Sequence, residues 1–221
     1  MKLIHGDCFE VMAGMADGSV DHIITDPPYS AWTHRNAKTN TSKNRTGEKL
    51  IHFDSWEADK FSAFTVECLR LSSRWIVMTC EHRFALSCPV DPIRIGAWVK
   101  RNPMPQISGD RPGQGHESVL ILHNEGKKRW NGGGRAAIWT TNSINKALMP
   151  TQKPLELICK FIQDFTDPGE TILDPCMGSG TVGVACKRLG RKFIGIEVLK
   201  DHCEIAKKRI EQEQMQGEMF T

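Results

Sequence analysis

The final third of the chain alternates strands and helices so regularly that it restricts the fold to one class. Apolar residues at helical spacing predict a helix over 155–165, which ends at Asp167-Pro168-Gly169. The pattern then predicts strand, helix, strand and helix over residues 171–174, 181–189, 192–197 and 201–214. Strands that alternate with helices in this way predict an α/β fold with a mostly parallel sheet and helices on both faces.

The first two thirds of the chain add further strands and two polar loops. Apolar β-branched residues predict a buried strand over 19–26, where two prolines follow that cannot continue it. A helix is predicted over 61–71, and strands are predicted over 75–80, 97–100 and 118–123. Residues 31–50 and 124–150 lack apolar periodicity and are predicted to be loops.

Length and composition exclude several classes of protein. A chain of 221 residues that is 39% hydrophobic is expected to form a single domain over 1–221, and a net charge of +3 excludes a disordered polyelectrolyte. No apolar run reaches the ~18 residues of a membrane span, and acidic residues interrupt the N-terminal segment, so we expect a cytoplasmic protein. The eight cysteines form no C-x-x-C pair, which argues against a disulfide scaffold and against a metal site.

A glycine-rich turn links the predicted strand over 171–174 to the helix that follows. It runs Asp174-Pro-Cys-Met-Gly178-Ser-Gly180-Thr-Val-Gly183, and glycines at such a turn let the backbone approach a small ligand. An acid at the turn suits a cationic amine better than a pyrophosphate, and Glu197 ends the next strand. The alternatives are a turn that only packs tightly and a solvated acid at the strand end.

A second motif, Asp26-Pro27-Pro28-Tyr29, ends the predicted strand over 19–26 and holds the only tyrosine of the chain. Proline fixes φ and lacks an N–H, so the Asp26 carboxylate and nearby carbonyl oxygens can be held toward one donor group. The exocyclic amino group of a nucleobase is such a donor, and Tyr29 could stack on the base. The alternative is a Pro-Pro turn with a surface tyrosine.

Together the two motifs resemble those of the S-adenosylmethionine-dependent amino-methyltransferases of DNA, which carry Asp-Pro-Pro-Tyr and Asp-Pro-Phe-x-Gly-Ser-Gly-Thr. Because the base motif precedes the cofactor motif, the chain is similar to the β group, a circularly permuted form of the Rossmann-like methyltransferase fold. The resemblance extends to Ile4–Cys8, Lys100–Glu117 and Thr151–Pro154. Two departures stand out: Cys176 replaces the usual phenylalanine, and the segment between His123 and Thr151 is too short for a large target-recognition domain.

The resemblance implies S-adenosylmethionine as cofactor, double-stranded DNA as partner, and a role in restriction–modification or in phage. It implies catalytic roles for Asp26, Pro27, Pro28 and Tyr29. It implies that Glu197 binds the ribose hydroxyls, Asp7 the adenine amino group and Asp174 the methionine end. The full implied cofactor set is Asp7, Cys8, Asp26, Thr151, Lys153, Asp174, Pro175, Cys176, Gly178, Ser179, Gly180, Thr181 and Glu197.

The expected reaction is methylation of adenine N6 in a base flipped out of the duplex. Three alternatives remain open: N4-cytosine methylation through the same geometry, a dinucleotide-dependent oxidoreductase from the glycine turn alone, and a catalytically silent DNA-binding module. Asp rather than Ser before Pro-Pro favours adenine by family precedent.

Basic residues are concentrated in the two polar loops, which predicts a phosphate-binding rim. The predicted DNA contacts are Arg35, Lys38, Lys43, Arg45, Lys49, Lys127, Lys128, Arg129 and Arg135. Four tryptophans in or beside these loops could stack at the vacated base or pack the loops onto the sheet: Trp32, Trp56, Trp130 and Trp139.

The C-terminal residues 212–221 are predicted to be a free tail. Within it Gln216–Phe220 resembles the peptide with which replication proteins bind a sliding clamp. A homodimer is a further partner that we consider.

Overall fold

The computed structural model describes residues 1–33, 55–106, 109–144, 147–149 and 151–213. In these residues one sheet contains the strands β1 (Lys2–His5), β2 (His22–Thr25), β3 (Trp75–Cys80), β4 (Arg94–Lys100), β5 (His116–His123), β6 (Ile138–Thr141), β7 (Thr171–Asp174) and β8 (Lys192–Glu197). The helices are α1 (Cys8–Ala13), α3 (Ala58–Leu71), α4 (His82–Leu86), α5 (Leu155–Phe165), α6 (Thr181–Arg188) and α7 (Lys200–Gln212). None of the described helices is long and apolar enough to cross a bilayer.

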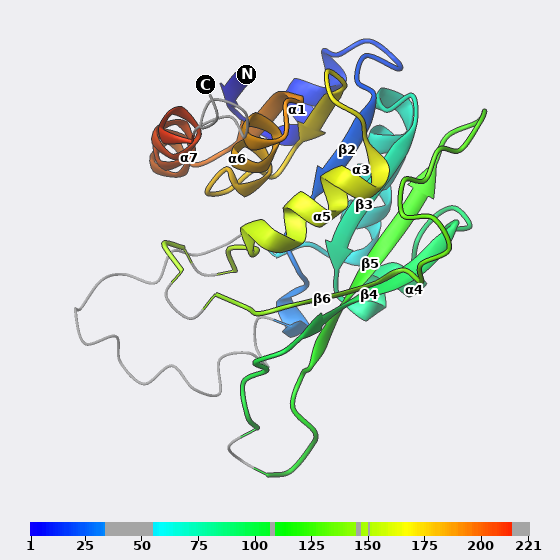
Figure 1. The fold of residues 1–221 in the computed structure, drawn as a ribbon, viewed down its shortest axis with the longest axis vertical. Coiled ribbons are helices and arrows are strands. Elements are labelled where there is room, and N and C mark those ends of the chain that lie inside the picture. Colours follow the sequence, from blue (N-terminus) through cyan, green and yellow to red (C-terminus); the bar gives the residue numbers. More distant parts are fainter. Residues whose placement is uncertain (34–54, 107–108, 145–146, 150, 214–221) are drawn as a thin grey trace.

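The strand order in the sheet is β1-β8-β7-β2-β3-β5-β4-β6, and only β5 runs antiparallel to its neighbours. Figure 1 shows the helices in layers on either side of this sheet. The predicted α/β class and mostly parallel sheet are therefore confirmed. The order also places β2 beside β7, so the two motifs lie at adjacent strand ends although they are far apart in the sequence.

Alternating side chains of the strands build a separate apolar layer on each face. In β2, Ile23 packs with the cluster that holds Phe61 and Phe64 of α3, whereas Ile24 packs with the cluster that holds Phe161 of α5. All five side chains are almost completely buried. Fully burying a side chain of this size contributes about 1.5–3 kcal/mol. Packing on both faces of the sheet therefore stabilises the strands whose ends carry the motifs.

Periodicity located the long buried elements correctly and missed several short ones. The strands over 75–80, 171–174 and 192–197 and the helix over 155–165 have the predicted bounds. The missed elements are β1, α1, α4 and β6, of which β6 lies inside the predicted loop 124–150. A signal for α1 was present, because Asp7 caps this helix by accepting hydrogen bonds from the backbone N–H groups of Phe9 and Glu10.

Candidate active site

A cavity of about 1240 Å³ opens at the carboxyl ends of β2, β3, β7 and β8. The position fits the general rule that ligands of open α/β sheets bind outside the carboxyl ends of the strands. Among the predicted site residues, those that line the cavity are Asp7, Cys8, Asp26, Pro27, Pro28, Tyr29, Thr151, Lys153, Asp174, Pro175, Cys176, Gly178, Ser179, Thr181 and Glu197. The two motifs therefore face one continuous space.

Within the implied cofactor set, Gly180 is the residue that does not line the cavity. A Cβ built on Gly180 would lie 2.7 Å from the Cβ of Ala206 in α7, so this glycine is required for helix packing. Gly178 differs, because it has a φ of 48° and a Cβ there would meet nothing within 4 Å. Gly178 is the glycine whose backbone is open to the cavity.

Asp174 lies almost completely buried at the end of β7. Its Oδ1 accepts hydrogen bonds from Thr25 Oγ1 at 2.7 Å and from the Cys176 backbone N–H at 3.1 Å. Burial raises the pKa of Asp174 to about 7, despite these two donors. A cationic group bound next to this carboxylate would favour its ionised form.

Glu197 is fixed at the tip of β8 by two backbone donors. Its Oε2 accepts from Gly178 N–H at 2.9 Å and its Oε1 accepts from Leu199 N–H at 2.9 Å. The His202 ring lies 3.7 Å from Oε1. A carboxylate held by one donor on each oxygen keeps lone pairs for the hydroxyl groups of a ligand.

Cys8 and Cys176 both line the cavity, where their thiols hydrogen-bond to each other. This hydrogen bond and burial raise the pKa of Cys176. The residue that replaces the usual phenylalanine therefore contacts α1 through sulfur.

Asp26 uses both carboxylate oxygens within the protein. Oδ1 accepts from Thr79 Oγ1 at 2.6 Å, and Oδ2 accepts from Lys153 Nζ at 2.5 Å. Burial raises the pKa of Asp26, and Lys153 opposes this rise. Lys153 follows Thr151, which has a φ of 66°, a strained conformation of the kind found near functional sites.

Glu117, at the start of β5, connects the base motif to two lysines. Its Oε2 accepts from Tyr29 Oη at 2.7 Å and lies 3.4 Å from Lys153 Nζ, while its Oε1 lies 2.7 Å from Lys100 Nζ. Burial alone would raise the pKa of Glu117, but the two lysines outweigh burial and lower it to about 2. The sequence indicated Glu117 only as the end of a resembling segment, because its three partners come from three separate parts of the chain.

Tyr29 is held as a hydrogen-bond donor. Burial, followed by the charge of Glu117, raises its pKa well above the ordinary value, so the phenol stays protonated. Its backbone carbonyl also accepts from the Trp56 N–H at 3.2 Å. The ring is thereby fixed at the wall of the cavity, as expected for a stacking surface.

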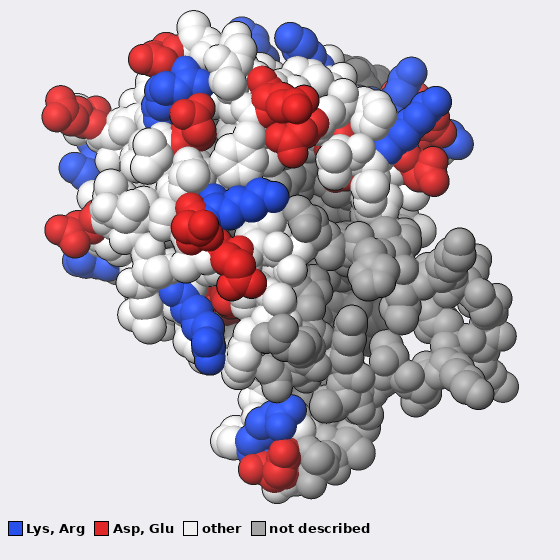
Figure 2. All heavy atoms as spheres, turned by 180° about the vertical axis from the view of Figure 1, so that it is seen from behind, with Lys and Arg blue, Asp and Glu red and all other residues white. Residues whose placement is uncertain are grey.

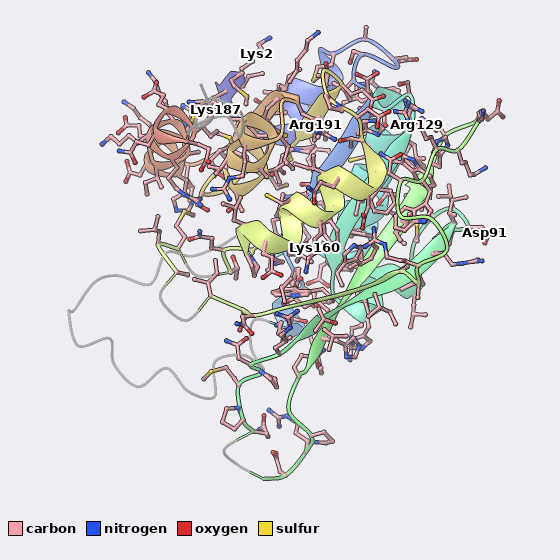
Figure 3. The ribbon with its side chains drawn as sticks, viewed as in Figure 1. Lys2, Asp91, Arg129, Lys160, Lys187 and Arg191 are labelled. Atoms are coloured by element: carbon pink, nitrogen blue, oxygen red, sulfur yellow. The ribbon has the colours of Figure 1, made fainter. Side chains whose placement is uncertain are left out.

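The structure corrects the predicted DNA contacts in 124–135. Because β5 is antiparallel, His123 pairs with Trp75 at the start of β3, and the following loop lies at the edge of the sheet opposite the cavity. Figures 1 and 3 show this segment, with Arg129 labelled, at the upper end of the sheet. Lys127, Lys128, Arg129 and Arg135 do not line the cavity.

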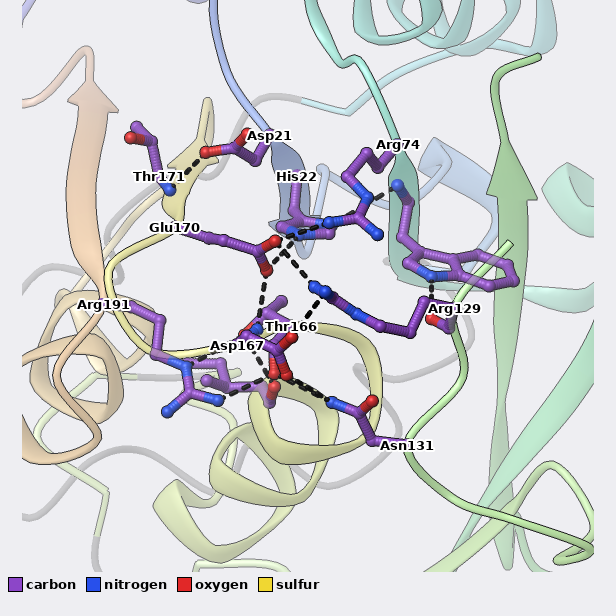
Figure 4. A network of polar contacts seen from close by, with 12 residues as sticks. Asp21, His22, Arg74, Arg129, Asn131, Thr166, Asp167, Glu170, Thr171 and Arg191 are labelled. Carbon is purple, nitrogen blue, oxygen red and sulfur yellow. Dashed lines mark hydrogen bonds and ion pairs between the residues drawn. The ribbon is translucent and has the colours of Figure 1, made fainter. Parts of the chain in front are cut away.

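Arg129 is also neutralised where it lies. It pairs with Glu170 at 2.7 Å and with Asp167 at 2.6 Å, in a network that includes His22 and Arg74 (Figure 4). Arg135 likewise pairs with the carboxylate of Asp164. The structure does not place these two arginines at the cavity, because β5 runs in a direction that was not foreseen, and their contact with DNA phosphate stays a prediction.

The predicted tryptophans divide between core and cavity. Trp56 is only 3% exposed and packs on Phe9 and Phe64, and Trp130 and Trp139 pack on each other and on Phe165. Trp32 is 42% exposed and lines the cavity, with the Arg83 guanidinium 4.1 Å above its ring. Trp56 also lines the cavity, so two of the four border it, and Trp32 is the more exposed of the two.

The remaining predicted DNA contacts lie outside the described residues: Arg35, Lys38, Lys43, Arg45 and Lys49. On the described part of the face seen in Figure 2, basic and acidic side chains are interspersed. The same part of the chain contains no group of three or more His, Cys, Asp or Glu side chains that could hold a metal ion.

Comparisons with known proteins agree with this geometry. A family model described as DNA methylase, for the N6 and N4 enzymes, matches residues 90–208. The type II methyltransferase M2.DpnII of Streptococcus pneumoniae is 30% identical over an alignment of 249 residues, gaps included. The alignment covers 96% of this chain and 90% of that protein. M2.LlaDCHI of Lactococcus lactis subsp. cremoris, also a type II methyltransferase, is 28% identical over 244 residues, covering 94% of this chain and 88% of that protein. The crystal structure of M1.HpyAVI in complex with SAM superposes with a TM-score of 0.68 at 30% identity and covers 94% of this chain and 98% of that chain.

Proposed function

The chain belongs to the family of N6 and N4 DNA methylases, which use S-adenosylmethionine, and we propose that it methylates the N6 amino group of adenine in double-stranded DNA. The observation that carries this proposal is the single cavity that reaches from Glu197 and Gly178 to Asp26 and Tyr29. A methyl donor in the first half of this space would face an amine in the second half.

The residues of the first half fit S-adenosylmethionine. Gly178 leaves open space where a side chain would stand, and the buried Asp174 carboxylate suits a cationic amino group. We assign Asp174 to the methionine end, Glu197 to the ribose hydroxyls and Asp7 to the adenine amino group. When bound, the cofactor supplies an electrophilic methyl group on a sulfonium.

The residues of the second half act on the amine. The lone pair of an aromatic amine is delocalised into its ring, which makes it a poor nucleophile. Hydrogen bonds from its two hydrogens to Asp26 and to a carbonyl of Pro27 or Pro28 favour a pyramidal nitrogen, and the Asp26 carboxylate stabilises the positive charge that develops. Catalysis is otherwise the positioning of the nitrogen about 3 Å from the methyl group.

Tyr29 contributes to holding the flipped base. Removing a base from the stack costs a few kcal/mol, and stacking on an aromatic ring returns roughly 1–3 kcal/mol. Trp32, at the same cavity, provides a second aromatic surface. Among the described cations, Arg83 and Arg111 are exposed near its mouth, and we assign them to phosphates there.

The direct test is mass analysis of nucleosides after incubation of DNA with the chain and S-adenosylmethionine. We expect N6-methyl-2′-deoxyadenosine from the wild type and none from Asp26→Ala. Glu156→Gln is a matched control, because Glu156 is an exposed carboxylate whose ion pair, among the described residues, is with its helix neighbour Lys160. N4-methyl-2′-deoxycytidine in place of N6-methyl-2′-deoxyadenosine would overturn adenine and keep methyl transfer, and an absence of methylated nucleosides would overturn the function.

Three further proposals stand beside this function. Action on chromosomal or phage DNA would place the chain in the cytoplasm. Binding of Gln216–Phe220 to a sliding clamp remains a prediction on residues outside the described part of the chain, and a peptide of residues 212–221 that fails to bind the clamp would end it. A homodimer also remains a prediction, which the molar mass in solution would decide.

A further inference from the structure

A lysine occupies the acceptor that the target amine needs. Lys153 Nζ lies 2.5 Å from Asp26 Oδ2, while Thr79 holds the other oxygen at 2.6 Å. The Lys153 side chain is only 8% exposed, and the two neighbouring carboxylates raise its pKa although burial lowers it. The group beside Asp26 is therefore a charged ammonium that solvent does not screen.

This arrangement conflicts with methyl transfer if it persists. As the N–CH₃ bond forms and the S–CH₃ bond breaks, the positive charge moves from sulfur to the amine nitrogen. An ammonium on the same carboxylate oxygen would repel that charge, and repulsion is strong in a partly buried site. The contact of Lys153 with Asp26 Oδ2 thus has to be released before the reaction.

A second acceptor for the lysine is already in place. Glu117 Oε2 lies 3.4 Å from Lys153 Nζ, so a movement of less than about 1 Å would make a charge-assisted hydrogen bond. Glu117 itself is held by Lys100 at 2.7 Å and by Tyr29 at 2.7 Å. It can therefore keep its position while the lysine moves.

We propose that Lys153 transfers from Asp26 to Glu117 when the target amine enters, so that Asp26 Oδ2 becomes the acceptor for the amine. Glu117 is then a positioning residue, and this inference rests on the methyl transfer proposed above. After transfer the methylated nitrogen releases its extra proton through Asp26 to solvent, and Lys153 returns to Asp26. Lys153 and Glu117 keep their charges throughout this cycle.

A double-mutant cycle on the single-turnover rate tests the inference, with Glu117→Gln, Lys153→Gln and the double variant. If Glu117 acts only by receiving Lys153, we expect Glu117→Gln to slow transfer by about 10- to 100-fold when Lys153 is present and by less than about 2-fold in the Lys153→Gln background. Equal slowing in both backgrounds would overturn the inference, as would an unchanged rate in Glu117→Gln.

Two further measurements separate this effect from damage to the fold. Each variant used should show a cooperative thermal melt well above the assay temperature, and calorimetric binding of S-adenosylmethionine should match the wild type for the Glu117 and Lys153 variants. If Glu117→Gln does not fold, Glu117→Asp replaces it, because this variant keeps the charge but withdraws the acceptor by one methylene; the same dependence on Lys153 is expected. Glu170→Gln, which removes a carboxylate from an ion network at the opposite edge of the sheet, should leave the rate within about 2-fold.

The outcomes also distinguish the inference from the proposed function. Wild-type chain that labels DNA, together with equal slowing in both backgrounds, overturns only the lysine transfer. Wild-type chain that labels no DNA overturns both. Labelling of cytosine leaves the cycle valid, because the chemistry of the exocyclic amine is the same.

Discussion

The two ends of the parallel strands each carry a network of ion pairs centred on a glutamate, and one of these networks lines the cavity described above. At the carboxyl ends of the strands, Glu117 joins Tyr29, Lys100 and Lys153. At the opposite edge, Glu170 accepts from His22, Arg74, Arg129 and the Asp167 N–H (Figure 4). In both networks donors and cations lower the pKa of the glutamate to about 2.

The two networks differ in whether a charged side chain has open space and a second partner beside it. The side chains around Glu170 do not line the cavity, and they join the starts of β2, β3 and β7 to the loop after β5. Around Glu117, Lys153 lies between two carboxylates at 2.5 and 3.4 Å beside open space. A glutamate with a lowered pKa can thus belong either to a structural ion network or to a reactive site. Here the position of Glu117 beside the cavity distinguishes the two.

The largest expected effect is on Asp26, the carboxylate assigned to the target amine. Asp26→Asn keeps the shape of the side chain but removes the charge that balances the methylated amine, so we expect a loss of about 1000-fold in single-turnover methyl transfer. Binding of S-adenosylmethionine should change by less than about 3-fold. A variant that retains a tenth of the wild-type rate in a tritium-transfer assay would contradict the assigned role.

Glu170→Gln tests the structural half of the comparison. Removing the charge leaves Arg74 and Arg129 without their shared partner and should lower the free energy of unfolding by about 2 kcal/mol, measured by urea denaturation at neutral pH. Because the folded pKa of Glu170 is about 2 and its ordinary value is 4.5, this contribution is present above pH 4.5 and disappears as pH falls through about 2. The wild type and the variant should therefore converge in acid, and a gap that persists below pH 2 would rule out this origin.

Asp174 provides a pH-dependent test on the cofactor side. With a pKa of about 7 in the free chain, Asp174 is mostly protonated at pH 6, and S-adenosylmethionine should bind about 10-fold more weakly there than at a pH well above 7. Calorimetry between about pH 5.5 and 8.5 measures this, against Asp174→Asn as the control that cannot ionise. Equal pH profiles for the wild type and the control would contradict the assignment.

The smallest expected effect concerns the loop after β5, which contains Lys127 and Lys128. Lys127→Ala with Lys128→Ala should leave the salt dependence of DNA binding unchanged, because both lysines lie across the sheet from the cavity. Each phosphate contact contributes about 0.9 to the slope of log K against log salt. A slope that falls by about 2 in a filter-binding or anisotropy assay would restore the original prediction for this loop.

The sequence predicted the parts of the site that depend on single strands. Asp26 and Asp174 each end an apolar run that is readable from periodicity alone, and the structure then places β2 and β7 side by side. Glu117 could not be predicted in the same way, because its role arises from contacts with Tyr29, Lys100 and Lys153. Local sequence carries no record of such long-range contacts.

The direction of β5 could not be predicted from the sequence either. Ser118–His123 has the same apolar pattern whether it runs parallel or antiparallel, yet its direction decides at which edge residues 124–135 emerge. Gly180 illustrates a related limit, since glycines that contact a ligand and glycines that admit a helix look alike in sequence. The packing of Gly180 against α7 and the open space at Gly178 distinguish the two roles in the structure.

The pairing of β1 with β8 and of β2 with β7 has a consequence for biosynthesis. Half of the sheet joins strands from opposite ends of the chain, and the acids Asp174 and Glu197 belong to the late partners. A nascent chain on the ribosome that has not yet reached residues 171–197 lacks both the neighbours of its first two strands and the acids assigned to the methyl donor. Translation must therefore pass these residues before the molecule can modify any DNA, even though Asp26 and Tyr29 are among the earliest residues made.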